Sequence, residues 1–143
     1  MKEWTKITKL PIDPAEVLAS VRERSAGGTV VFVGTIRNQS EGRAVSGLEY
    51  EVYKVMAEKG MREISENVRK KWPVKKISMV HRYGALGVGE ISVAVAVSSE
   101  HRAEAFEACR FAIDTIKRAL PIWKKERFKG GRGVWVKGTP IGS

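Results

Sequence analysis

Apolar and polar residues along the 143-residue chain follow two different periods, and these periods predict its elements. A repeat of three to four residues marks amphipathic helices over residues 53–72 and 100–120. A shorter helix is predicted from Asp13, which precedes Pro14 at the first helical position, to about Arg24. Short apolar or alternating runs predict strands at residues 4–10, 29–36, 45–52, 76–83, 90–98, 124–128 and 133–137.

Two segments rich in polar residues or glycine are predicted to be connections. Residues 37–44 (RNQSEGRA) form a polar loop, and residues 84–89 (GALGVG) join two neighbouring strands as a hairpin. Because only some strand pairs have a helix between them, the pattern favours an α+β fold with a mixed or antiparallel sheet. The length is that of one domain spanning residues 1–143.

The apolar positions also predict a core. Strand 29–36 is apolar and β-branched almost throughout, which is typical of a strand covered on both faces. Cys109 lies on the apolar stripe of the long helix and is interpreted as a buried structural thiol. His81 alternates with Met79 and Tyr83 and is interpreted as structural or partly exposed. The stripe of the long helix predicted to be buried is Phe106, Cys109, Ile113, Ile116 and Leu120.

Charge and cysteine content add a class of partner and a compartment. With 26 Lys and Arg against 16 Asp and Glu, the net charge is +10, which predicts an anionic partner or substrate. The charge alone does not separate nucleic acid, an acidic protein, an anionic membrane and a phosphorylated small molecule. The single cysteine excludes an internal disulfide and favours a reducing compartment. Without an apolar run of membrane-spanning length or a signal-peptide core, we expect a cytoplasmic protein.

Two places in the sequence have the chemistry of an anion site. Arg37 follows directly after an apolar strand, a position that commonly faces a cleft, although a lone arginine of this kind is by default a surface residue. His101 and Arg102 lie at the start of the long helix, where free N–H groups and the helix dipole attract anions. A solvated helix start is an equally good interpretation of that pair.

The densest basic stretch covers residues 117–127 and contains Lys117 and Lys124 on either side of Pro121. A lysine crowded by other cations, or partly desolvated, has a depressed pKa and becomes usable as a base or nucleophile. The simpler interpretation is a charged helix end, because cations are favourable near a helix C-terminus.

Four motifs follow one another in the sequence: FVGxxRN at 32–38, HRxGxLxxGE at 81–90, HRxxAF at 101–106 and DxxKxxxPxWKxE at 114–126. Together they resemble the large, catalytic subunit of molybdopterin synthase over roughly residues 28–136. The resemblance implies an α/β hammerhead fold with an additional antiparallel β subdomain. It also implies a sulfurtransferase of molybdenum cofactor biosynthesis, which converts cyclic pyranopterin monophosphate (precursor Z) to molybdopterin by inserting two dithiolene sulfurs.

The resemblance further implies partners and site residues. Sulfur would arrive as a thiocarboxylate on the C-terminal Gly-Gly of a small ubiquitin-like sulfur-carrier subunit, and two large subunits would form a homodimer within a heterotetramer. No metal, cofactor, nucleic acid or membrane is expected. The catalytic residues carried over are Lys117 and Lys124. The substrate-binding residues carried over are Thr35, Ile36, Arg37, His101, Arg102, Lys117, Lys124, Lys125 and Glu126.

The spacing of these residues limits how they can meet. An unbroken helix places His101 and Lys117 roughly 24 Å apart at 1.5 Å per residue, which is too far for one small pterin pocket. If both bind substrate, His101 and Arg102 must come from the neighbouring subunit of the dimer. Two other hypotheses stand beside the enzyme. One is a small basic nucleic-acid-binding module, against which the four tryptophans are scattered and not clustered on one strand face. The other is a structural partner without catalysis.

Overall fold

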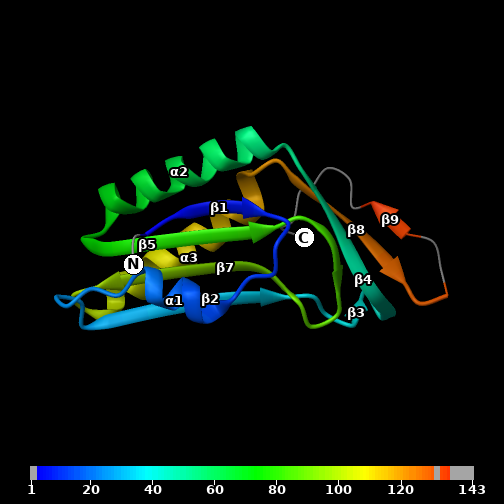
Figure 1. Cartoon of the computed structure of the whole chain (residues 1–143), viewed down its shortest axis with the longest axis horizontal. Coiled ribbons are helices and arrows are strands. Elements are labelled where there is room, and N and C mark those ends of the chain that lie inside the picture. The colour runs from blue at the N-terminus through cyan, green and yellow to red at the C-terminus, as the bar shows by residue number, and fades with distance from the viewer. Residues whose placement is uncertain (1–2, 131–132, 136–143) are drawn as a thin grey trace.

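The computed structural model describes residues 3–130 and 133–135, which form three helices and two β-sheets (Figure 1). The helices are α1 (Pro14–Ser20), α2 (Lys54–Lys71) and α3 (Arg102–Ala119). The strands are β1 (Thr5–Thr8), β2 (Gly28–Thr35), β3 (Gln39–Ser40), β4 (Arg43–Val52), β5 (Val74–Arg82), β6 (Gly84–Gly87), β7 (Ile91–Ser99), β8 (Ile122–Phe128) and β9 (Gly133–Trp135). None of the described helices is long and apolar enough to cross a membrane.

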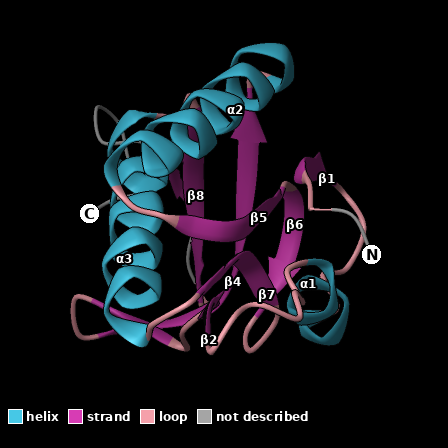
Figure 2. Ribbon diagram, turned by 90° about the vertical axis from the view of Figure 1, so that its left-hand side faces the viewer, coloured by secondary structure: helices cyan, strands magenta, loops and turns pink. Residues whose placement is uncertain are grey.

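The main sheet has four strands in the order β1-β5-β7-β2. β1 is parallel to β5, and the other two pairs are antiparallel. α2 and α3 cover one face of this sheet and α1 covers the other (Figure 2). Side chains of β7 alternate between the two faces, as the two-residue period of a strand requires. Val93, Val95 and Val97 join the larger core under α2 and α3, whereas Ala94 and Ala96 join the smaller core under α1.

The second sheet is antiparallel throughout. Its two longest strands, β4 and β8, pair with each other and extend beyond the end of the main sheet (Figure 1). Its order is β3-β4-β8-β9, and β6 pairs with β4. The segment GALGVG was therefore predicted wrongly as a plain hairpin connection, because its first four residues form β6. Gly84, with φ of +98°, allows the sharp turn from β5 of one sheet into β6 of the other.

The α+β class, the mixed sheet and the antiparallel β subdomain are confirmed, while several strand ends lie one or two residues from the predicted positions and two segments differ more. α1 ends at Ser20 and not near Arg24, because a turn follows in which the Ala26 N–H donates to the Glu23 carbonyl at 3.0 Å. The polar segment 37–44 contains a two-residue hairpin between β3 and β4. Glu41 and Gly42 have φ of 49° and 79° there, as this tight hairpin turn demands.

The edge position of β2 explains two further differences. Both of its faces are packed as predicted, Val30 and Phe32 against the larger core and Val31 against the smaller one, but its residues are mostly half-buried because β2 is the last strand of the main sheet. Phe106 is 59% exposed although it was predicted to be buried. At 100° per residue, Phe106, Ile113 and Lys117 share one flank of α3, which lies on the side of β2. Cys109 is buried as predicted, and its burial raises the pKa of the thiol to about 11.

Candidate functional site

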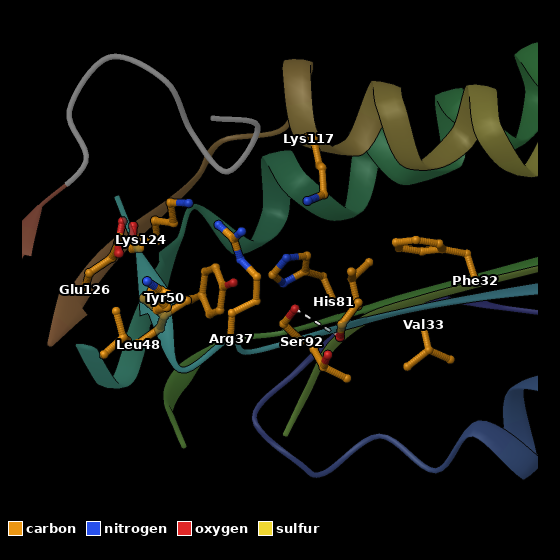
Figure 3. Close-up of a pocket in the computed structure, with 16 residues that line it drawn as sticks. Phe32, Val33, Arg37, Leu48, Tyr50, His81, Ser92, Lys117, Lys124 and Glu126 are labelled. Carbon is orange, nitrogen blue, oxygen red and sulfur yellow. Dashed lines mark hydrogen bonds between the residues drawn. The ribbon is translucent and has the colours of Figure 1, made fainter. Parts of the chain in front are cut away.

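A cavity of about 370 Å³ opens where β2 ends, between the main sheet, the last turn of α3 and the second sheet (Figure 3). This volume falls within the range of small-molecule sites. Five of the predicted site residues line it, and they come from three separate parts of the chain. These residues are Thr35, Arg37, Lys117, Lys124 and Glu126.

Element ends bring these side chains together. β2 delivers Arg37 just beyond its last residue, and the last turn of α3 carries Lys117. Pro121 stops the helix, and β8 then runs back along β4, so that Lys124 returns to the same cavity. Because strand side chains alternate, Glu126 points to the same side of β8 as Lys124. Three residues of the basic stretch 117–127, namely Lys117, Lys124 and Glu126, therefore line the same cavity.

The other predicted residues lie elsewhere. The side chain of Ile36 is buried in the larger core, and its N–H donates to the Glu90 carbonyl at 3.0 Å. Lys125 lies on β8 between the two residues that face the cavity and does not line it. His101 and Arg102 are exposed at the opposite end of α3 from Lys117. One copy of the chain therefore does not bring the two ends of α3 into one site.

Two glycines show what lies beside the start of α3. A Cβ atom on Gly27 would be 2.4 Å from the carbonyl oxygen of Glu100, and one on Gly28 would be 3.3 Å from Cα of Arg102. The beginnings of β2 and α3 are therefore in close contact. From this point β2 and α3 both run toward the cavity. α3 therefore has His101 at the end away from the cavity and Lys117 at the end beside it.

The cavity is cationic. Arg37, Lys117 and Lys124 line it together with the single carboxylate of Glu126. Burial lowers the pKa of Lys124, the positive charges of Lys117 and Arg37 lower it further, and Glu126 acts in the opposite direction. The lowered pKa of Lys124 fits the second of the two interpretations of this basic stretch, a lysine partly desolvated and crowded by cations, and not the simpler one of a solvated helix end. Converging cations of this kind bind an anion through charge-assisted hydrogen bonds.

Sequence reasoning missed the floor of the cavity, which His81, Tyr50 and Ser92 form (Figure 3). His81 is 2% exposed, and its ring meets that of Tyr50 edge-on at 5.1 Å. The Ser92 hydroxyl donates to the Gly34 carbonyl at 3.4 Å. Burial lowers the pKa of His81 to about 4, with the charge of Lys117 contributing. His81 was visible in the HRxGxLxxGE motif, but only the pairing of β5 with β7 brings it beneath α3.

A family model described as MoaE protein matches residues 7–119. The chain belongs to the MoaE protein family. A relative named molybdopterin synthase catalytic subunit, from Thermoplasma volcanium, is 43% identical over 132 residues, which cover 92% of this chain and 96% of the relative. The solved structure of molybdopterin synthase from Staphylococcus aureus superposes with a TM-score of 0.85 at 40% identity, covering 90% of this chain and 93% of that one.

A solved structure from Helicobacter pylori shares the fold at 22% identity with a TM-score of 0.77, covering 95% of this chain and 92% of that one. It was solved as a protein-protein complex of subunits 1 and 2 of molybdopterin-converting factor. The close match to MoaE structures confirms the fold implied by the four motifs. The catalytic and substrate-binding roles of individual residues remain predictions.

Proposed function

We propose that this MoaE family member is the catalytic subunit of a molybdopterin synthase. It converts cyclic pyranopterin monophosphate to molybdopterin by inserting two dithiolene sulfurs. The observation that carries this function is the convergence of Arg37, Lys117 and Lys124 on one cavity. A phosphorylated substrate and an anionic sulfur donor both need such a cationic site, and the names of the relatives supply the reaction.

The proposed sulfur donor is a small ubiquitin-like subunit that ends in a Gly-Gly thiocarboxylate. A glycine tail is narrow enough to enter a cavity of about 370 Å³, and its terminal anion suits the cations there. The two-subunit complex of the Helicobacter pylori relative is consistent with a partner of this kind.

In the proposed chemistry, the ammonium groups of Lys117 and Lys124 stabilise the anionic thiocarboxylate, whose sulfur bonds to the pterin. They then stabilise the oxyanion that forms when water, or Lys117 as its free amine, adds to the acyl carbon; collapse of this oxyanion breaks the acyl C–S bond, leaves the sulfur on the pterin and leaves the acyl group on the nucleophile. Lys117 acts as general acid and base or as a transient acyl acceptor. Arg37 holds the substrate phosphate, and Thr35 lies beside it at the end of β2. Glu126 faces Lys124 from the same strand, β8, and Lys125 completes the stretch.

His101 and Arg102 complete the phosphate site from a second copy of the chain in this proposal. β2 is an edge strand and Phe106 is exposed on the adjoining flank of α3, so this face is available for an interface. A two-fold axis near the middle of α3 brings the beginning of one helix to the end of the other. Each site then receives Lys117 from one protomer and Arg102 from its partner.

The direct test is sulfur transfer from a thiocarboxylated small subunit to the cyclic pterin substrate. Replacing Lys117 by alanine should lower the rate about 100-fold or more, because a preorganised charge at the reacting group is lost. Arg118→Ala is the matched control, since Arg118 is the next residue of α3, is exposed and does not line the cavity. Full activity in Lys117→Ala, with thermal unfolding unchanged, would contradict the proposal.

The nucleic-acid alternative is not supported. Among the described residues, the tryptophans whose contacts are known lie in three separate places and form no continuous stacking face. Trp4 packs near α1, Trp72 lies 5.4 Å from Phe111, and Trp123 meets Tyr53 edge-on at 5.1 Å.

A further inference from the structure

His81 is a buried histidine in the floor of a cationic cavity, and none of the roles given above uses it. It lies on the face of β5 that packs beneath α2 and α3, since Ile77 and Met79, four and two residues earlier, belong to the core on that side. At 2% exposure it is more buried than any charged residue of the cavity. A polar ring in this position needs a hydrogen-bonding role.

The backbone fixes which ring nitrogen carries the proton. Nδ1 of His81 lies 2.8 Å from the carbonyl oxygen of Arg82. Because a carbonyl oxygen only accepts, Nδ1 carries the hydrogen and donates it. In the neutral ring, Nε2 is then the hydrogen-bond acceptor. Burial keeps the ring neutral at physiological pH by lowering its pKa to about 4.

α3, β4, β8 and the segment after β2 bring charged or titratable groups into the cavity around this ring. α3 carries Lys117, whose side chain extends from the last turn of the helix down toward His81 (Figure 3). β4 supplies Tyr50, whose ring packs edge-on against the imidazole. Lys124 and Glu126 lie on the other side of the cavity, and the side chain of Arg37 stands between them and His81 in the view of Figure 3. Of these groups, Lys117 is the one whose charge acts on His81.

A neutral acceptor suits an ammonium that has to bind an anion. A carboxylate beside Lys117 would hold the ammonium but cancel the charge that attracts the substrate, and a second cation would repel it. A neutral imidazole accepts one N–H of the ammonium and leaves its positive charge in place. The flexible lysine side chain is then ordered before the substrate arrives.

We propose that His81 is a positioning residue for Lys117, whose ammonium donates a hydrogen bond to Nε2 of His81 and is thereby held over the bound anion. This inference rests on the proposed function, because it assigns His81 a part in the sulfur transfer at that site. It distinguishes His81 from the packing residues of the same strand, whose loss would change stability without changing the chemical step.

Two substitutions of His81 distinguish the role of Nε2 from that of Nδ1. Glutamine at position 81 places its amide oxygen near the position of Nε2, whereas asparagine places its amide near Nδ1 and leaves no acceptor for Lys117. We expect His81→Gln to keep kcat within about threefold and His81→Asn to lower it roughly tenfold or more, with KM for the small subunit unchanged. Met79→Leu, two residues earlier on the same buried face, is the control for packing, and thermal unfolding checks that each variant folds.

A double-mutant cycle with Lys117→Ala, measured in single turnovers, decides whether His81 acts through Lys117. If it does, adding His81→Asn to Lys117→Ala causes no further loss. Multiplied losses, or a His81→Gln variant as slow as His81→Asn, would overturn the inference while leaving the proposed function intact. Absence of sulfur transfer in the unsubstituted protein would overturn both.

Discussion

The two ends of α3 carry similar cationic side chains in opposite surroundings. At the C-terminal end, Lys117 is half-buried and shares a cavity with groups from β2, β4, β5 and β8. At the N-terminal end, the side chain of His101 is 77% exposed, and its Nε2 lies 3.7 Å from the carboxylate of its neighbour Glu100. What differs is the set of strands that converge on each end. The Lys117 end lines a formed cavity, whereas the His101 end lies on the surface.

The burial of the cavity at the Lys117 end can be measured through His81, as a dependence of folding stability on pH. Because burial lowers the pKa of His81 to about 4, the native state keeps the ring neutral while the unfolded chain protonates it below about pH 6.5. The corresponding stability is fully present above pH 6.5 and is lost as the pH falls toward 4. It amounts to about 3 kcal/mol.

Urea unfolding between pH 7.5 and pH 4 should therefore show a weaker pH dependence in His81→Gln than in the unsubstituted protein. The groups facing the ring (Lys117, Tyr50, Arg37, Lys124 and Glu126) are present in both proteins, so the difference isolates His81. Met79→Leu, which changes a buried residue of the same strand without altering a titratable group, is the control and should retain the original pH dependence. If the free energy of unfolding changed equally with pH in all three proteins, His81 would be accessible to solvent and not buried as the structure shows.

A smaller effect is expected from a substitution on the flank of α3 that lies between its two ends. Phe106 is 59% exposed on the side of β2, so Phe106→Glu should destabilise an interface on this face by about 1–2 kcal/mol per protomer. Because the side chain is mostly exposed, thermal unfolding of the monomer should change little. Sedimentation at a series of concentrations would measure the shift toward monomer, with Arg118→Gln, which also lowers the charge by one unit at an exposed position of α3, as the charge-matched control. An unchanged dimer would place the interface elsewhere.

Local periodicity was sufficient to predict α2, α3 and most strands, because the buried positions of each element repeat along the sequence. Arg37, Lys117 and Lys124 stood out as an arginine after an apolar strand and as part of the densest basic stretch, but it was the resemblance to the family that assigned them to the site. Which strands pair with one another could not be predicted from local periodicity. β6 forms because it pairs with β4, and Phe106 is exposed because β2 is the edge strand; neither partner is close in sequence.

The floor of the cavity shows the same limit. His81, Tyr50 and Ser92 come from β5, β4 and β7, and no spacing along the chain relates them. The register that pairs His81 with Val93 brings β5 beside β7, and the contact with Tyr50 arises where β4 crosses the end of the main sheet. A histidine on an alternating strand therefore has no distinguishing signal until the fold is known.

Mixed dimers test most directly whether the two ends of α3 from different protomers form one site. Lys117→Ala and Arg102→Ala subunits are each expected to be impaired alone, the second by roughly tenfold or more through lost phosphate binding. In a two-fold dimer that shares its sites, each mixed dimer contains one intact site and one doubly substituted site. Random mixing of equal amounts should then restore sulfur transfer in about a quarter of all sites, and isolated mixed dimers in about half. Activity no higher than the average of the two parent variants would contradict the account, because it would mean that each site takes both residues from one chain.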